Sequence, residues 1–323
     1  MMELPLHLQT LYAELLQQLL MAPGEVGSVY IQTAGGARYA YLRRTTGVVR
    51  RDTYIGPETE PGTQARIAEI KHSQSLARQR RKIVSLLKHA GLPGPSTMIG
   101  RVLDALADAQ LFRESVLIGT GAYQCYSAVT GYRLPSAALT TQDADIATAS
   151  LAIAAAEAQD TMLAILQRAD PTFRPIPGLK PADPPSAFAS ANGFMVDLVT
   201  PQLRRTDRNP MPLPALSAGA APLQHLKWLI EEPVTAAAVH GAGVLIKLPQ
   251  PARFAVHKLI LAQKRGAHEH AKRTKDLRQA GALIDVLQRS NPAALEDAMA
   301  DAESQGRTGW KEPLRRSLRE LKQ

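Results

Sequence analysis

Two aspartates separated by one residue, Asp143 and Asp145, have the residue type and spacing that best suit metal chemistry in this sequence of 323 residues. Alternate residues of a β-strand point to the same face, so both carboxylates can meet one ligand. Hard cations such as Mg²⁺ prefer carboxylate oxygens. A pair of exposed aspartates in a turn is the alternative interpretation.

A glycine turn lies about one strand upstream of this acidic pair. The apolar run Val116–Ile118 is typical of a buried strand, and it leads into Gly119-Thr120-Gly121, where the backbone can turn tightly and approach a ligand. We expect a helix from this turn to Gly131, with its first backbone N–H groups facing a phosphate. The third glycine of a dinucleotide fingerprint is missing, because position 124 is Gln124. An ordinary strand-to-helix turn remains the alternative.

Asp197 is the expected third carboxylate. It lies inside the apolar run Phe194–Val199, where a bare buried carboxylate is costly without a cation. Together with Asp143 and Asp145 it could hold two metal ions, which neutralise triphosphate charge and activate an attacking hydroxyl. The alternatives for Asp197 are the exposed face of an edge strand and a salt bridge to an arginine.

The glycine turn followed by the acidic pair resembles the signature of the polymerase-beta-like nucleotidyltransferase superfamily. Other stretches resemble one bacterial branch of it, an uncharacterised nucleotidyltransferase-fold family; they are Tyr54-Ile55-Gly56-Pro57, Leu111-Phe112, Thr141-Gln142-Asp143 and Pro251 to Lys258. The resemblance covers about residues 25–290 and departs at Gly121, where that branch has a bulkier residue. It implies an α+β fold, with a mixed sheet of nucleotidyltransferase type and flanking helices, a small N-terminal β-meander and a helical C-terminal part.

The C-terminal part also resembles the AbiE-type toxin nucleotidyltransferases. This resemblance implies that Lys258 contacts the triphosphate and that Lys275 and Asp276 line the same cleft. Arg265 shares a helix face with Lys258 and is a further candidate for nucleotide binding. The alternatives are a lysine that snorkels to water at position 258 and a solvated ion-pair face at positions 275 and 276.

The charge of the chain indicates a polyanionic partner. The net charge is +9 and the isoelectric point is about 9.7. A basic helix is expected over residues 64–90, and Arg78, Arg80, Arg81 and Lys82 crowd its second half. These side chains suit contacts with the phosphates of RNA, although a solvated positive surface has the same composition.

Composition and hydropathy exclude several other classes. Cys125 is the single cysteine, which excludes an internal disulfide and a cysteine-rich zinc site and suits a reducing cytoplasm. No apolar run approaches the roughly 20 residues that cross a bilayer, and no signal peptide is recognisable. We therefore expect a cytoplasmic protein without membrane contact, whose oligomeric state the sequence does not give.

The pattern of apolar residues, glycines and prolines predicts three parts: residues 1–94, 95–250 and 251–323. The first part contains an amphipathic helix over 3–21, a β-meander that we interpret as a small structural platform, and the basic helix. In the second part, we expect a helix capped by Ser96 or Thr97 and an alanine-rich helix over 149–168. Strands are expected at 193–199, at 225–231 and at 234–248, where Gly241-Ala242-Gly243 interrupts the run. Loops are expected at 171–193, with at most a short strand near Phe173, and at 201–222. C-terminal helices are expected at 251–265, 267–289, 292–304 and 309–322.

The sequence thus predicts a nucleotidyltransferase dependent on Mg²⁺ or Mn²⁺. It would move a nucleoside monophosphate from a nucleoside triphosphate to an acceptor hydroxyl, and RNA, including tRNA, is the favoured acceptor. Two alternatives stay open. One is a nucleic-acid-binding or toxin–antitoxin module that kept the fold and lost catalysis. The other is a nucleotidyltransferase that acts on a protein or a small molecule.

Overall fold

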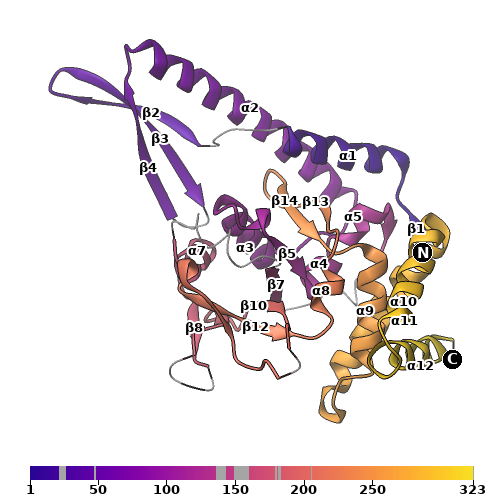
Figure 1. The fold of residues 1–323 in the computed structure, drawn as a ribbon. Coiled ribbons are helices and arrows are strands. Elements are labelled where there is room, and N and C mark those ends of the chain that lie inside the picture. The colour runs from indigo at the N-terminus through magenta and orange to yellow at the C-terminus, as the bar shows by residue number, and fades with distance from the viewer. Residues whose placement is uncertain are drawn as a thin grey trace.

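A computed structural model describes residues 1–21, 27–46, 49–135, 143–148, 160–178, 180, 183–204 and 206–322 of the chain. Figure 1 shows an N-terminal β-meander with two helices, a central mixed sheet, and a group of helices at the C-terminus. The expected α+β class is confirmed. None of the described helices is long and apolar enough to cross a membrane.

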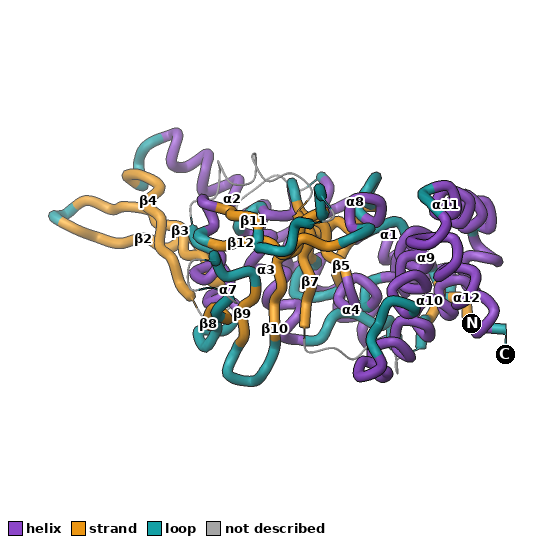
Figure 2. The backbone as a smooth tube through the Cα atoms, turned by 60° about the horizontal axis from the view of Figure 1, so that its bottom comes forward, coloured by secondary structure: helices purple, strands orange, loops and turns teal. Residues whose placement is uncertain are grey.

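The N-terminal region combines two helices with a three-stranded antiparallel sheet of order β2-β3-β4. Apolar side chains of α1 and of the second half of α2 pack together and against β13, with Leu15 and Leu87 fully buried. The meander projects from the rest of the molecule in both views (Figures 1 and 2). The elements of this region are β1 (Met2–Glu3), α1 (Leu6–Leu20), β2 (Ser28–Ala34), β3 (Ala37–Thr46), β4 (Val49–Pro57) and α2 (Pro61–His89).

The central sheet has the strand order β11-β12-β10-β7-β5, with β9 paired to β10 and β8 to β9. Strand β10 runs parallel to β7 and to β12, whereas β5 is antiparallel to β7. The elements that build this region are α3 (Thr97–Asp108), η1 (Leu111–Arg113), β5 (Ser115–Ile118), α4 (Gly119–Tyr123), α5 (Tyr126–Thr130), β6 (Tyr132–Arg133), β7 (Asp143–Thr148), α7 (Met162–Ala169), β8 (Arg174–Ile176), β9 (Ala187–Ala189), β10 (Met195–Pro201), β11 (Met211–Leu213), η3 (Pro214–Leu216) and β12 (Ala218–Leu223).

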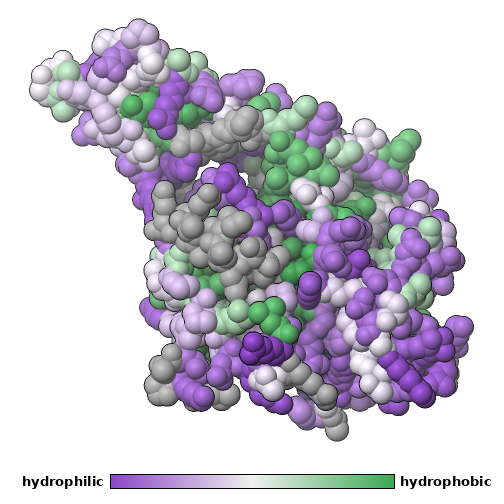
Figure 3. Space-filling model, in the orientation of Figure 1, coloured by the Kyte–Doolittle hydropathy of each residue, from purple (hydrophilic) through white to green (hydrophobic). Residues whose placement is uncertain are grey.

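The C-terminal helices pack around α9, which contacts α10, α11 and α12. Their outer surface, at the lower right of Figure 3, is predominantly hydrophilic, as expected for helices that bury one apolar face. Before them lie α8 (Leu226–Leu229) and the hairpin of β13 (Val234–Ala238) and β14 (Val244–Leu248). The helices are α9 (Pro251–Ala262), η4 (Ala267–Glu269), α10 (His270–Ser290), α11 (Pro292–Ser304), the π-helix η5 (Arg307–Lys311) and α12 (Glu312–Leu321).

Side-chain caps begin α3 and α11, and the first of them confirms the predicted cap at Ser96. The Ser96 side chain accepts a hydrogen bond from the backbone N–H of Ile99, and α3 begins at Thr97, directly after Ser96. The Asn291 side chain caps α11 in the same way through Ala294 N–H, with Pro292 in the first helical position. Both caps satisfy backbone donors that would otherwise lack a partner.

Several predicted elements are wrong. The expected strand at 225–231 is instead the short helix α8, because His225 takes a left-handed backbone conformation (φ 63°) and starts a helical turn. The loop expected at 171–193 contains β8, which is the short strand allowed near Phe173, and also β9, which was not expected. The loop expected at 201–222 contains β11 and most of β12. Strand β12 is built from small residues that are typical of loops, but Gly219 lies against Pro184 and Pro210, where a Cβ atom would be only 2.9–3.0 Å away.

Two predicted helices differ from the expected lengths. The helix that follows the glycine turn is divided into α4 and α5, and Gly131 ends it in the left-handed conformation expected for a glycine there (φ 72°). Helix α7 begins only after Thr161, whose side chain accepts a hydrogen bond from Ala164 N–H. Residues 149–159 of the predicted alanine-rich helix lie outside the described residues.

Candidate functional site

The register of the central sheet brings the glycine turn and two predicted aspartates into one row. Ile118 of β5 pairs with Asp145 of β7, and Asp145 pairs with Asp197 of β10. Asp143 pairs with Met195, two residues earlier along the same strands. Directly paired residues lie on the same face of a sheet. The side chains of Asp143 and Asp145 lie outside the described part of the structure.

A cavity of about 520 Å³ opens beside this row. Its sheet side includes Ile118, Gly119, Thr120 and Asp197, and its other side is formed by α9 and α10. Asp197 is half-buried there. The side chains of Val196 and Leu198, which alternate with Asp197 along β10, are fully buried in the core instead. The alternation therefore directs the carboxylate of Asp197 to the cavity rather than to bulk solvent.

The glycine turn forms one edge of the cavity. Gly119 has a φ of 69°, in the left-handed region that glycine adopts without strain, and α4 begins at this residue. Thr120 lies in the wall, and Gln279 of α10 donates a long hydrogen bond of 3.5 Å to its hydroxyl. Gly121 is buried behind the wall, where a Cβ atom would contact Leu117. A bulkier residue at position 121 would therefore point into the core.

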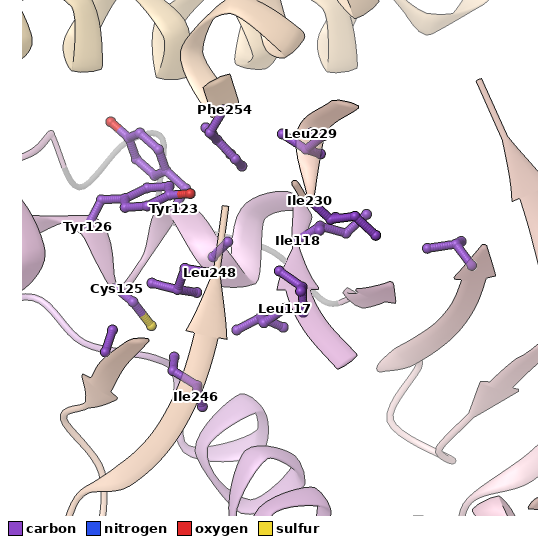
Figure 4. Close-up of a cluster of buried hydrophobic side chains, with 14 of the residues drawn as sticks. Leu117, Ile118, Tyr123, Cys125, Tyr126, Leu229, Ile230, Ile246, Leu248 and Phe254 are labelled. Atoms are coloured by element: carbon purple, nitrogen blue, oxygen red, sulfur yellow. The ribbon is translucent and has the colours of Figure 1, made fainter. Parts of the chain in front are cut away.

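Helix α9 is fixed above the glycine turn by aromatic packing. The Phe254 ring lies 5.1 Å from the Tyr126 ring and 6.4 Å from the Tyr123 ring, measured between centroids (Figure 4). The Tyr126 hydroxyl donates a hydrogen bond of 2.8 Å to the carbonyl of Pro249, just before the helix. This packing sets the position of the cationic face of α9 relative to the sheet.

Lys258 forms a buried charged group with Asp276 and Arg265. The Lys258 ammonium donates to Oδ1 of Asp276 at 2.7 Å, and the Arg265 guanidinium donates to Oδ2 at 3.1 Å. Asp276 is only 1% exposed and Lys258 6%. Lys258 therefore does not snorkel to bulk water, and Asp276 does not belong to a solvated ion-pair face. All three side chains line the cavity, as does Lys275.

The cavity is predominantly positive among its described side chains. Lys264 and Lys272 join the cations already named, which gives five basic side chains against the carboxylates of Asp197 and Asp276. Burial lowers the pKa of Lys264 below its usual value. A ligand with several negative charges would relieve the repulsion between these cations, so the electrostatics suit a polyphosphate.

Two histidines in the wall were not predicted from the sequence. Burial, with a contribution from Lys258, lowers the pKa of His257 to about 3. His225 is a hydrogen-bond partner of Lys264, and burial followed by that lysine lowers its pKa to about 4. The helical spacing Phe254, His257, Lys258, Leu261 would have revealed His257, because these residues share one face of α9. No sequence signal pointed to His225.

We expect acid to destabilise the protein through His257. In the unfolded chain this imidazole binds a proton below about pH 6.5, whereas in the folded chain it stays neutral down to about pH 3. Its contribution to stability is therefore complete above pH 6.5 and is lost as the pH falls, by roughly 3 kcal/mol at pH 4. Urea unfolding of wild type and His257→Gln, once above pH 6.5 and once at pH 4, measures this loss of stability. The variant should show a smaller loss, and the exposed His7→Gln serves as the control; equal losses in all three proteins would contradict the prediction.

The described side chains contain no group of three or more His, Cys, Asp or Glu residues that could hold a metal ion. The side chains of Asp143 and Asp145 are not among them. What the structure shows is the donor chemistry: Asp197 offers carboxylate oxygens to the cavity, and the backbone of Asp145 is its immediate neighbour in the sheet. These residues fit a hard divalent cation.

The basic helix α2 presents its predicted cations on different sides. Arg78, Arg81 and Lys82 are exposed. Arg80 is only 5% exposed, and burial together with the nearby Arg81 lowers its pKa. Arg80 therefore lies outside the exposed basic surface of α2, because its position on the helix faces the interior.

A family model described as "Nucleotidyltransferase" matches residues 97–304, which include the glycine turn, the row of strands and the cationic helices. The chain belongs to the nucleotidyltransferase family. This nucleotidyltransferase is therefore an enzyme that transfers nucleotidyl groups, and its substrates include a nucleoside triphosphate. Membership decides against the alternative of a module without catalysis. No curated protein and no solved structure matches the chain.

Proposed function

We propose that this enzyme is a polymerase-beta-like nucleotidyltransferase that depends on Mg²⁺ or Mn²⁺ and adds a nucleoside monophosphate to an acceptor hydroxyl. One observation carries the proposal. The paired positions Ile118, Asp145 and Asp197 place the glycine turn and two aspartates side by side at the edge of a cationic cavity. Phosphate binding and metal binding are thereby supported at one place.

The metal ions would be held by Asp145 and Asp197, together with Asp143, which lies two residues before Asp145 on β7 and on the same face of the sheet. When bound, they would supply charge neutralisation for the triphosphate and a lower pKa for the attacking hydroxyl. Cations of α9 and α10 line the same cavity as Asp197 and complement the charge of a bound triphosphate.

The triphosphate would lie between the glycine turn and the C-terminal helices. The backbone at Gly119 and Thr120 approaches a phosphate closely because no side chain intervenes at position 119. Lys258, Arg265 and Lys275 face it from α9, the following turn and α10. Asp276 holds Lys258 and Arg265 in place, so that these two side chains would bind the phosphates with little loss of side-chain entropy.

The reaction then proceeds by substitution at the α-phosphorus. The acceptor oxygen forms a bond to the α-phosphorus, the bond to the bridging oxygen breaks, and pyrophosphate leaves with that electron pair. The proton of the acceptor hydroxyl passes to solvent or to a carboxylate of the row. Positive charge around the cavity stabilises the charge that develops on the leaving pyrophosphate.

RNA, including tRNA, is the acceptor that the charge of the chain favours. Arg78, Arg81 and Lys82 are exposed along α2, and the net charge is +9. A role in a toxin–antitoxin pair, as in the AbiE-type enzymes, and a cytoplasmic location are parts of the same proposal. A protein or small-molecule acceptor is the competing possibility, in which the exposed cations of α2 have no part.

The test is incubation with each α-labelled nucleoside triphosphate, Mg²⁺ and total cellular RNA or protein. We expect the label to enter the RNA fraction, and to be lost with chelator. Label in protein would overturn the RNA acceptor and keep nucleotidyl transfer. Label that persists at full rate without divalent metal would overturn the metal-dependent mechanism.

A further inference from the structure

The outer face of the β-meander carries a ladder of tyrosines. Tyr30 of β2 pairs with Tyr41 of β3, which pairs with Tyr54 of β4. The rings of Tyr30 and Tyr41 are stacked with centroids 5.5 Å apart, and Tyr54 lies 5.4 Å from Tyr41. Tyr39 extends the ladder at 6.2 Å from Tyr54. Four of the eight tyrosines of the chain therefore lie on one small sheet face.

This face is open, although its side chains are aromatic. Tyr54 is 50% exposed and the other three tyrosines are half-buried. The opposite face packs inward, with Ala40 and Leu42 fully buried. The ladder is thus not the buried side of the meander, and the half-exposed ring of Tyr54 is the part that it presents most openly to a ligand.

Arginines lie beside the Tyr30 end of the tyrosine ladder. Arg43 stacks on the Tyr30 ring at 4.5 Å and is held there by two hydrogen bonds of 2.8 Å to Asp52. Arg43 also lines a cavity of about 420 Å³ together with Arg78 and Arg81 of α2. Asp52 offsets the charge of Arg43, so the positive charge at this end of the face comes mainly from α2.

The meander is joined to the central region by ion pairs. Arg51 of β4 binds Asp160 at 3.1 Å, and the buried Arg168 of α7 binds Asp108 at 3.3 Å and also contacts Asp160. Arg44 of β3 approaches Asp108 at 4.0 Å. A ligand on the tyrosine ladder would therefore be held at a defined place relative to the central sheet.

We propose that the tyrosine ladder binds single-stranded RNA, with bases stacked on the rings and backbone phosphates in the cavity of Arg43, Arg78 and Arg81. Stacking requires exposed base faces, which a duplex hides, and it tolerates many sequences. Phosphates supply the negative charge that complements the arginines. The proposal rests on the proposed acceptor class, but binding at this face needs neither nucleotide nor metal.

The experiment measures binding of a labelled single-stranded RNA of mixed sequence, and of its duplex, in chelator without nucleotide. Wild type should prefer the single strand. Tyr54→Leu, which removes the ring and keeps an apolar side chain, should weaken binding about 10-fold, whereas Tyr54→Phe should bind like wild type. Arg78→Gln and Arg81→Gln should each reduce the salt slope by about 0.7, with the exposed Arg316→Gln on α12 as the charge-matched control.

Three results would overturn the proposal: equal affinity for duplex and single strand, wild-type affinity in Tyr54→Leu with an unchanged melting temperature, or loss of affinity in Tyr54→Phe equal to that in Tyr54→Leu. The first two reduce the ladder to a cross-strand contact that stabilises the meander. The third indicates that the Tyr54 hydroxyl contacts the RNA and that stacking on the ring is not what holds it. Failure of nucleotidyl transfer to RNA leaves these binding results unaffected, so the two proposals fail separately.

Discussion

Asp197→Asn is expected to lower the rate of nucleotidyl transfer by about 100-fold or more, because the cavity loses a charge that complements the metal ions and gains nothing in return. Asparagine has nearly the same shape as aspartate, and Asp197 is half-buried at the edge of the cavity. The melting temperature should therefore change little. Asp145→Asn and Asp143→Asn should behave in the same way, and initial rates of label transfer measure all three.

Asp285→Asn provides a matched control for these substitutions. Asp285 is exposed on α10, outside the cavity, so its loss should leave the rate unchanged. Wild-type activity in Asp143→Asn or Asp145→Asn would exclude the two-metal mechanism. If Asp197→Asn alone is active, the third carboxylate has only a structural role in β10.

Asp276→Ala is expected to reduce the free energy of unfolding by about 3–5 kcal/mol, because it removes the acceptor shared by two cations. Asp276 is 1% exposed and Lys258 is 6% exposed, so water cannot replace the carboxylate as the partner of the ammonium group. The substitution leaves the ammonium of Lys258 buried beside Arg265 without its carboxylate. Urea denaturation at pH 7 measures the loss.

The variant Lys258→Met tests whether Lys258 contributes to nucleotide binding separately from its contribution to the stability of the fold. Asp276 keeps its bond to Arg265 in this variant, so the loss of stability should be smaller than in Asp276→Ala. Binding of a non-hydrolysable triphosphate should nevertheless weaken, and Lys258→Arg should restore it only in part, because a planar guanidinium replaces a compact charge. Calorimetric titration decides the point. Unchanged binding in Lys258→Met would show that Lys258 supports the fold and not the phosphates.

The glycine turn and the cavity-lining face of the helix that begins at Pro251 could be predicted from the sequence, because their local residue patterns are strong. Gly119 directly after a short apolar run predicted a turn at the end of a buried strand, and the turn is there with a positive φ. The helical period predicted over residues 251–265 put Phe254, Lys258 and Arg265 on one face, and all three line the cavity. The metal roles of Asp143 and Asp145 stay predictions, since their side chains lie outside the described residues.

Contacts between distant segments were not accessible in this way. The pairing of Lys258 with Asp276 depends on how α9 packs against α10, and sequence spacing does not give that arrangement. The burial of Arg80 likewise depends on which face of α2 meets its neighbours. The four tyrosines of the meander lie one on β2, two on β3 and one on β4, and only the strand register places them beside one another as a ladder.

The pairing of β5, β7 and β10 also has a consequence for how the enzyme matures. These strands occupy residues 115–118, 143–148 and 195–201, so each pairing closes a long loop of chain. The C-terminal helices, by contrast, form from neighbouring residues and pack largely on one another. Long-range pairing is slow compared with local helix formation, and a slip of one residue between β7 and β10 would move Asp145 to the opposite face of the sheet. A newly made chain therefore acquires most of its helices before its carboxylate row, and catalytic competence is among the last properties that folding confers.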